Sequence, residues 1–450
     1  MTSTPAAPAP RARNSMLHLS DLLRRPITGR GGESIGRLSD MIVRLRGADD
    51  PVVTGLVAAV GSRRVFVPID QVASLDGDEL RLTSAKLDLR QFERRHGEVL
   101  LRADVLGHRL IDVESVRLIR AGDLELVQRD GDWAVAGVDS HRRSRRLLRR
   151  GFGHGGGRGF GRGGGRDHAG GRDHAFREWA NFEPLIGHSG SALLRGPFGR
   201  IRRLKPAQIA DLLENASKDE ETEILGQVHA DPELEADVFE ELDEDLATRL
   251  LGARTDGEIA AVLARMRADD AADAIAELPQ RRRQPVLDRL PAGPRAKVLT
   301  LMGYNPTSAG GLMNMDFVAL PAGSSVAAAI AAVSAADALQ PEALTSVHAL
   351  DDDGRLSGVA KLVTLVQASP GSTLAAVCDD DPVRVAADTD VVDVAVLMSD
   401  YNLITVPVVD SRRKMIGVIT IDDVIEVTLP EDWRRREAAQ PPDSRRGGPE

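Results

Sequence analysis

The chain has 450 residues, of which 42% are hydrophobic, 28% are charged and only 3% are aromatic. That length is enough for about two to four domains with their own cores. The single cysteine, Cys378, excludes an intrachain disulfide, a CxxC redox centre and a thiolate zinc cluster. The longest charge-free apolar stretch, 326–336, is shorter than the roughly 20 residues of a membrane span. We therefore expect a soluble, cytoplasmic protein with no transmembrane segment.

Charge is divided unevenly along the chain, whose net charge is −10. Residues 1–200 hold 33 basic and 24 acidic side chains, whereas residues 201–450 hold 25 basic and 44 acidic ones. A strongly acidic globular half favours cations over nucleic acids as partners. A solvated acidic surface with no ligand predicts the same composition, so charge alone leaves both interpretations open.

The first part of the chain indicates a small β domain. Residues 1–15 are rich in Pro and Ala without periodicity, which predicts a disordered tail. Residues 16–139 alternate short β-branched runs with Gly and Asp turns, which indicates an antiparallel barrel, compatible with two copies of one unit. The stretch GESIGRLSDMIVRL, followed by GLVAAVG, resembles the PRC-barrel domain. This resemblance implies a role in partner binding or a ribosome-linked role, and no catalysis.

Residues 140–200 have the composition of a linker. They begin with the basic run HRRSRRLLRR, and 12 of the 21 positions in 151–171 are glycine. Such a segment buries too little apolar surface to offset its ordering entropy, so a flexible linker is the favoured interpretation. RNA binding through Arg and Gly, and metal capture by His154, His168 and His174, remain alternatives.

The acidic half predicts helices first and mixed structure afterwards. Residues 201–304 place aliphatic side chains at helical spacing, in segments that recur about every 10 to 14 residues, which indicates an α-helical superhelix. Residues 305–370 and 371–430 repeat one plan of strand, helix, strand, charged turn, strand and helix. Residues 431–450 are polar and Pro-rich, which predicts a disordered tail. The predicted fold class is multidomain α+β.

The second repeat carries a recognisable motif. Its hairpin VPVVDSRRKMIGVITIDDV matches the cystathionine β-synthase (CBS) domain, whose signature G-x-x-T-x-D-D lies at 417–423. The resemblance implies that Thr420 and Asp423 bind the ribose of ATP or another adenosyl nucleotide. The first repeat has Lys361 and Thr364 at these positions, so at most one of the paired sites keeps this contact. Thr420 and Asp423 also fit an N-cap pair at the start of the last helix, which leaves the nucleotide role open.

A larger resemblance spans about half of the chain. The helical region, the junction YNPTSAGGLMNMDFVALP and the two CBS repeats together resemble the cytosolic region of MgtE-type magnesium transporters. That family implies acidic surfaces that repel each other until Mg²⁺ binds between them. Asp269 and Asp273, spaced i and i+4, would form one wall of this site, and Asp423 with Glu426 the other. Asn402 stands where the family predicts an acidic residue, so we expect it to weaken such a site.

The sequence therefore predicts a non-enzymatic, Mg²⁺-sensing regulator. We expect its partners to be a divalent cation, a membrane transporter or other protein, and a second copy bound through the CBS pair. The sequence contains no phosphate loop of the GxxxxGK[ST] type and suggests no trio of nucleophile, base and orienting residue. The alternative is an RNA- or ribosome-linked adaptor, in which the PRC-like module and the Gly/Arg linker bind the partner and the CBS pair is a scaffold.

Overall fold

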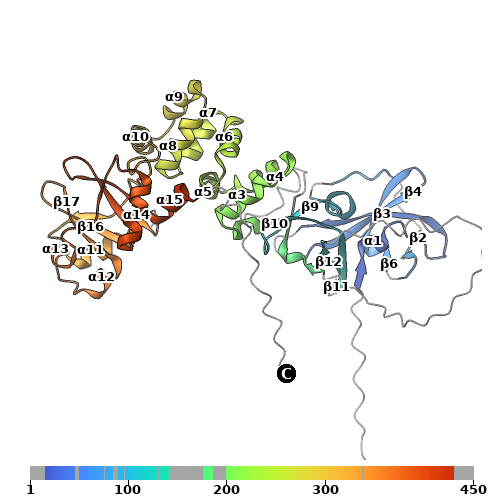
Figure 1. Ribbon diagram of the computed structural model, residues 1–450. Helices are drawn as coiled ribbons and strands as arrows, with labels where there is room; N and C mark the ends of the chain where they lie inside the picture. Colours follow the sequence, from blue (N-terminus) through green and yellow to red (C-terminus); the bar gives the residue numbers. More distant parts are fainter. Residues whose placement is uncertain are drawn as a thin grey trace, which may run out of the picture. The chain divides into compact units, whose positions relative to one another are not determined.

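The computed structural model describes residues 16–45, 50–75, 77–84, 90–95, 97–129, 131–140, 176–185, 199–336 and 339–429. The chain divides into two compact units at Leu242–Asp243 (Figure 1). The two predicted tails and the glycine-rich part of the predicted linker lie outside the described residues. Across the described ranges, no helix combines the length and the apolar character that a membrane crossing requires.

The first unit begins with a β half-barrel module whose two ends share one main sheet. Its strands are β1 (Met16–His18), β2 (Pro26–Thr28), β3 (Ser34–Arg44), β4 (Val52–Val60), β5 (Arg63–Pro68), β6 (Val72–Ser74), β7 (Leu80–Leu82), β8 (Val99–Leu100), β9 (Arg109–Asp112), β10 (Arg117–Arg120), β11 (Asp123–Arg129), β12 (Asp132–Asp139), β13 (Arg177–Glu178) and β14 (Phe182–Pro184). The main sheet interleaves both ends of the module, because β1 pairs with β11 and β12 pairs with β4. A second sheet has the order β10-β9-β14.

Residues 177–184 belong to this module, although their position in the sequence suggested part of the linker. Strand β13 pairs with β12, and β14 pairs with β9. Trp179 and Phe182 are buried in the core of the module, and Arg177 forms ion pairs with Asp112 and, at 2.7 Å, with Glu114. Strands of two or three residues carry no readable periodicity, which is why the sequence pattern did not reveal them.

Three helices complete the first unit. They are α3 (Pro206–Glu214), α4 (Lys218–Val228) and α5 (Pro232–Glu240). Pro206 and Pro232 occupy the first helical turn, where the missing amide hydrogen costs nothing. Arg109 of β9 donates to Glu220 Oε2 at 2.9 Å and to the carbonyl oxygen of Asn215 at 3.1 Å. These contacts join the helices to the β half-barrel module.

The second unit starts with the helices α6 (Glu244–Gly252), α7 (Asp256–Leu263), α8 (Ala268–Glu277), α9 (Gln280–Leu287) and α10 (Ala292–Leu301). They confirm the predicted helical segments. Helix α8 packs against α6, α9 and α10. It does so through the buried side chains of Ala271, Ala272 and Ile275, which follow the i, i+1, i+4 spacing of one helix face. The small alanines bring neighbouring helices close, so the acidic side chains of α8 lie beside other elements.

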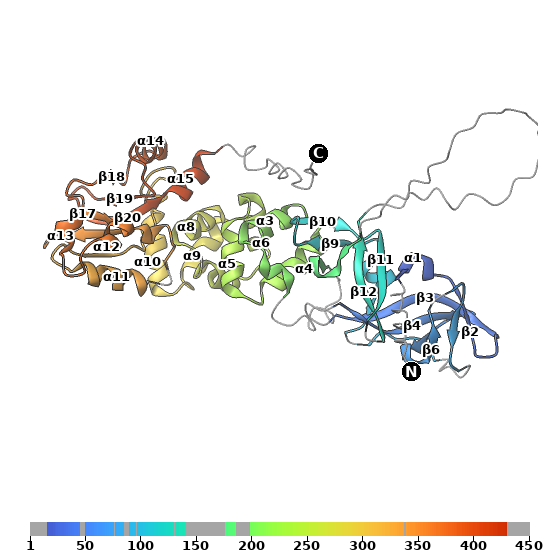
Figure 2. The ribbon, with the colours of Figure 1, turned by 90° about the horizontal axis from the view of Figure 1, so that it is seen from below.

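Two CBS repeats follow, and Figure 2 shows their elements from α11 to α15 in orange and red. The first holds β15 (Ala319–Pro321), α11 (Val326–Ser334), β16 (Ser346–Leu350), β17 (Leu356–Lys361) and α12 (Leu362–Gln367), and α13 (Leu374–Val377), which follows it in the chain, packs against β17. The second holds β18 (Val385–Ala386), α14 (Val391–Tyr401), β19 (Thr405–Val409), β20 (Met415–Thr420) and α15 (Ile421–Thr428). Each sheet has one parallel and one antiparallel pair in the same order, which confirms the predicted tandem repeat.

The junction between the helices and the CBS pair is tied to the second repeat. Asn314 exchanges two backbone hydrogen bonds with Val418 of β20, at 2.7 and 2.9 Å. A Cβ atom at Gly417 would lie 2.8 Å from the side chain of Met313 and 3.0 Å from the Asn314 carbonyl oxygen. The glycine of the CBS signature is therefore required for the junction to approach β20.

Candidate functional site

Thr420 and Asp423 form a closed N-cap pair at the start of α15. The Thr420 hydroxyl donates to Asp423 Oδ2 at 2.6 Å, and the Thr420 backbone amide lies 3.4 Å from the same oxygen. Both residues are buried, with exposed fractions of 0% and 5%. This geometry is that of the N-cap alternative. The Thr420 hydroxyl and the Asp423 carboxylate are thus hydrogen-bonded to each other.

Asp269 and Asp423, which the resemblance assigned to opposite walls of an ion site, lie within electrostatic reach of each other. Asp269 is in the first turn of α8 and is 6% exposed. Burial raises the pKa of Asp269 to about 7, and the negative charge of Asp423 adds to this rise, whereas Arg267 opposes it. Its Oδ1 atom has no hydrogen-bond partner among the described residues. Burial also raises the pKa of Asp423, against the opposing effects of Thr420 and Arg267.

The other residue of each predicted wall, Asp273 on α8 and Glu426 on α15, is exposed at the edge of the same region. Partial desolvation raises the pKa of Asp273 to about 6, followed by the negative charges of Glu244, Glu277 and Glu426. Glu244 on α6 was not identified from the sequence, because its approach to α8 depends on helix packing. The structure thus brings all four predicted carboxylates to the region where α8 faces α15.

Arg267 joins the two sides of this region and was also missed. Its Nη1 atom donates to Asp423 Oδ1 at 2.8 Å, and its Nε atom lies 2.6 Å from Asp270 Oδ2. Arg267 is the N-cap residue of α8. A positive charge is unfavourable at a helix N-terminus, so an arginine at the N-cap indicates an acidic partner that offsets this cost. The sequence could not reveal that this partner is 156 residues away.

The donor set suits a hydrated hard cation. In the part of the chain that the structure describes, no group of three or more His, Cys, Asp or Glu side chains could hold a metal ion. Zinc sites need such a group, whereas Mg²⁺ is commonly held by one or two carboxylates and several waters. A buried carboxylate oxygen with no hydrogen-bond partner among the described residues, within electrostatic reach of a second carboxylate, fits the latter. The alternative ligands His154, His168 and His174 lie outside the described residues.

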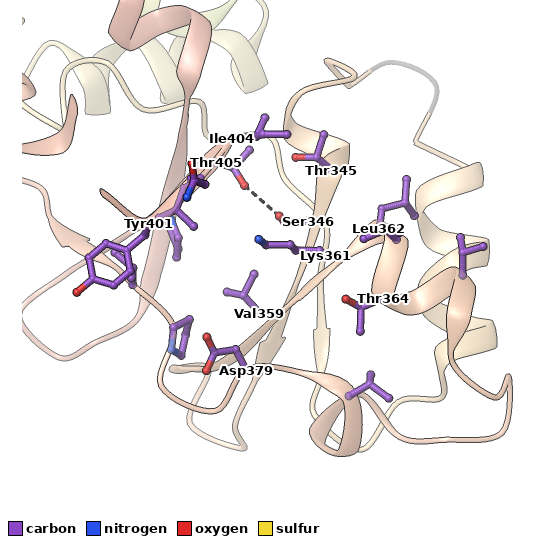
Figure 3. Close-up of a pocket in the computed structure, with 18 residues that line it drawn as sticks. Thr345, Ser346, Val359, Lys361, Leu362, Thr364, Asp379, Tyr401, Ile404 and Thr405 are labelled. Atoms are coloured by element: carbon purple, nitrogen blue, oxygen red, sulfur yellow. Dashed lines mark hydrogen bonds between the residues drawn. The ribbon is translucent and has the colours of Figure 1, made fainter. Parts of the chain in front are cut away.

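An open cavity of about 730 Å³ lies between the two CBS repeats, on the side of the first repeat (Figure 3). Figure 3 shows Lys361 extending into it, with Tyr401 on one side and Asp379 below. Above Lys361 in this view, the Thr405 hydroxyl donates to Ser346 Oγ at 3.1 Å. The lining is mostly apolar and includes Val359, Leu362, Val363, Thr364, Val366, Ile404 and Pro407. This ligand-sized space lies beside Lys361 and Thr364.

Asn402 also lines this cavity. It ends α14 in the left-handed conformation, with φ at 50°. Asparagine tolerates this conformation better than most residues. The position offers a local backbone reason for an asparagine, separate from the weakening of the ion site that the resemblance led us to expect.

Two family models match the chain. Residues 204–307 match the MgtE intracellular N domain, and residues 374–430 match the CBS domain. The first match begins before the boundary between the two units and ends at the junction. The second covers the repeat that carries the CBS signature.

Among curated proteins, the magnesium transporter MgtE of Thermus thermophilus is 34% identical over 183 residues, which are 39% of this chain and 40% of the relative. MgtE of Enterococcus faecalis is 28% identical over 131 residues, or 29% of each chain. The chain thus spans less than half the length of these relatives. Among solved structures, the cytosolic domain of the Mg²⁺ channel MgtE in complex with ATP is 27% identical, with a TM-score of 0.48, and covers 53% of this chain and 94% of that one. The soluble part of a magnesium transporter is 24% identical, with a TM-score of 0.47, over 50% and 88% of the two chains.

The fold and the two matches define a helical intracellular domain joined to a CBS pair. This part of the chain is homologous to the cytosolic region of the MgtE magnesium transporters. The MgtE and CBS resemblances stated from the sequence are thereby confirmed, whereas the PRC-barrel resemblance stays a prediction about the β half-barrel module.

Proposed function

We propose that this protein is a Mg²⁺-responsive regulator in which the ion binds between α8 and α15. The observation that carries the proposal is the pairing of Asp269 with Asp423. These carboxylates come from two different elements, both are buried, and the charge of one raises the pKa of the other. Burying two like charges side by side is unfavourable unless a cation neutralises them.

The chain's own residues give this site its response. Above about pH 7, where Asp269 and Asp273 are ionised, the carboxylates on α8 and α15 repel each other, and Asp273 with Glu426 adds to that repulsion. A divalent cation supplies the charge that cancels it. Asp269 Oδ1 is the oxygen best placed to accept such a ligand, because it makes no hydrogen bond within the described residues. Closure of α8 on α15 is then the signal that a partner protein reads.

Calorimetric titration of the full chain with Mg²⁺ at constant ionic strength tests this proposal. We expect Asp269→Asn and Asp423→Asn each to weaken Mg²⁺ binding by about tenfold or more, and the double variant to lose less than the sum of the two effects. Asp352→Asn removes an equal charge from an exposed turn of the same unit and is the matched control. Equal shifts in all three single variants would show only a diffuse counterion effect and would contradict the proposal.

We propose an adenosyl nucleotide, ATP being the first candidate, as a second ligand, bound in the cavity of the first repeat. Its volume is sufficient for such a molecule, and it combines apolar walls with the hydroxyls of Ser346 and Thr405 and the positive charge of Lys361. The solved MgtE cytosolic domain in complex with ATP supports the ligand class. The site proposed is accordingly different from the Thr420 and Asp423 pair that the CBS signature suggested.

ATP titration of the full chain distinguishes the two places. We expect Lys361→Gln to weaken ATP binding by about tenfold, because a phosphate loses its positive partner. Lys414→Gln, which removes the same charge from an exposed position of the second repeat, should leave it within about twofold. Loss of binding in Thr420→Val but not in Lys361→Gln would return the nucleotide to the signature pair.

We propose a membrane transporter or another protein as the partner that reads this state, and a cytoplasmic location for the module. The named relatives are magnesium transporters.

Dimerisation through the CBS pair remains a prediction, supported by the exposed Val392 and Val396 one turn apart on α14. The RNA-linked alternative depends on the PRC-like module together with the Gly/Arg linker, whose glycine-rich part lies outside the described residues. Pull-downs with and without nuclease test it, because an RNA adaptor loses its partners on digestion.

A further inference from the structure

Arg267 holds the position that a bridging cation would take. It leads directly into α8 and contacts Asp423 on α15 through Nη1 at 2.8 Å, while its Nε atom lies 2.6 Å from Asp270 on α8. The guanidinium therefore touches one carboxylate on each of the two elements that the proposed Mg²⁺ site connects. Its side chain is only 19% exposed, so solvent screens these contacts less than those of a surface ion pair.

An arginine at the start of α8 is unfavourable unless its charge is paired with those carboxylates. Arg267 is the N-cap of α8, where the positive end of the helix dipole repels a cation. Its side chain also makes no N-cap hydrogen bond, which Ser, Thr, Asp or Asn would supply. What offsets these losses is the ion pair with buried Asp423 and the adjacent negative charge of Asp269. The charge balance of the region is thus partly supplied by the chain itself.

We propose that Arg267 is an internal cation that competes with Mg²⁺ for Asp423 and so sets the concentration at which Mg²⁺ binds between α8 and α15. This inference rests on the proposed Mg²⁺ function and adds the residue that determines its threshold. Mg²⁺ must displace or outcompete the guanidinium to use Asp423 Oδ1. A chain without this arginine would bind Mg²⁺ at lower concentration, but its α8 and α15 would be less well held together before the ion arrives.

Two measurements on the full chain test the inference. Mg²⁺ titration calorimetry at constant ionic strength should give an apparent Kd about tenfold lower for Arg267→Gln than for the wild type, because one nearby positive charge is removed. Arg267→Lys keeps the charge without the two-point contact and should lie between them. Arg265→Gln is the matched control, with the same charge change two residues away on an exposed side chain that donates to the Ala261 carbonyl oxygen. It should stay within about twofold of the wild type.

Hydrogen exchange of 421–428 in a chelator is the second measurement. The backbone amide hydrogens of 421–428 should exchange several times faster in Arg267→Gln than in Arg265→Gln, because the contact between Arg267 and Asp423 is lost. An unchanged or higher Kd for Arg267→Gln would overturn the competition. If no variant binds Mg²⁺, the proposed function fails, and the exchange data then decide the internal bridge alone: faster exchange in Arg267→Gln supports it, and equal exchange overturns it.

Discussion

The two CBS repeats share a fold but differ in the surroundings of their matching positions. The second repeat carries the signature, yet Thr420 and Asp423 are buried against each other and Asp423 is further engaged by Arg267. The first repeat has Lys361 and Thr364 at the matching positions and borders the open cavity. A sequence signature therefore identifies which residues can bind a ligand, whereas the elements packed around them decide whether a ligand can reach them.

The difference has a physical origin in the surroundings of the two helices. Helix α15 starts beside the N-terminus of α8, whose Arg267 and Asp269 interact with Asp423. Helix α12 leaves Val363 and Val366 exposed, at 58% and 66%, and both line the cavity. We therefore expect the second repeat to respond to cations and the first to small molecules. The variants described below test this expected difference between the two repeats.

The largest expected effect concerns His348 of β16, whose counterpart in β19 is the buried Pro407. Burial lowers the pKa of His348 to about 4 from 6.5, while its contact with the Val318 carbonyl oxygen opposes the shift. The unfolded chain then binds more protons than the folded one between these values. The contribution of His348 to stability should fall by up to about 3 kcal/mol as the pH drops from about 6.5 to 4, and stay level above 6.5.

Denaturant unfolding across this pH range checks the prediction, with His348→Gln as the comparison. The raised pKa values of Asp269 and Asp273 act in the opposite direction, since the folded state binds more protons there as the pH falls. The difference between wild type and His348→Gln isolates the histidine. An identical pH dependence in both proteins would show that His348 is not held neutral by burial.

A smaller effect is expected where both repeats need a glycine. A Cβ atom at Gly417 would meet Met313 and Asn314, and one at Gly358 would meet Cys378 at 2.7 Å and the Asp379 carbonyl oxygen at 2.9 Å. Each Gly→Ala change should lower the free energy of unfolding by about 2 kcal/mol through overpacking. Gly371→Ala is the control, because no atom lies within 4 Å of its Cβ position. Thermal unfolding followed by circular dichroism measures all three, and a control as destabilised as the others would refute the steric explanation.

The smallest expected effect is a difference in stability between variants of Thr420 in the second repeat and Thr364 in the first. Thr420→Val removes the hydroxyl that donates to buried Asp423, and we expect a loss of about 1.5 kcal/mol of stability. Thr364→Val, at the cavity wall, should change stability by less than about 0.5 kcal/mol. Urea unfolding of the two variants provides the comparison. Equal losses would mean that the two repeats use these threonines in the same way.

The sequence predicted the architecture of the second unit well, because helix periodicity, the Gly-rich junction and the repeated plan are local patterns. The carboxylates of α8 and α15 were chosen through a family resemblance, and the structure brings them together. Three features could not be read from local patterns. They are the contact of Arg267 with Asp423, the contact of Arg109 with Glu220, and the return of 177–184 to the β half-barrel module. Each depends on elements that are distant in sequence.

The nucleotide site shows a different limit. The motif at 417–423 was correctly recognised, and its N-cap alternative was also correct as a description of the geometry. The sequence did not show how accessible these positions are in each repeat, because accessibility depends on how α8, α12 and α14 pack. Lys361 was visible as a departure from the signature, but its place in an open cavity was not.

The most direct test of the division between the repeats is hydrogen exchange of the full chain, with Mg²⁺ and ATP added separately. The account predicts that Mg²⁺ slows exchange in α8 and α15 and leaves α12 unchanged, whereas ATP slows exchange in α12 and the adjoining strand β17 and leaves α15 unchanged. A chelator and a monovalent salt of equal ionic strength serve as controls for screening. Protection of α12 by Mg²⁺, or of α15 alone by ATP, would contradict the assignment of one ligand to each repeat.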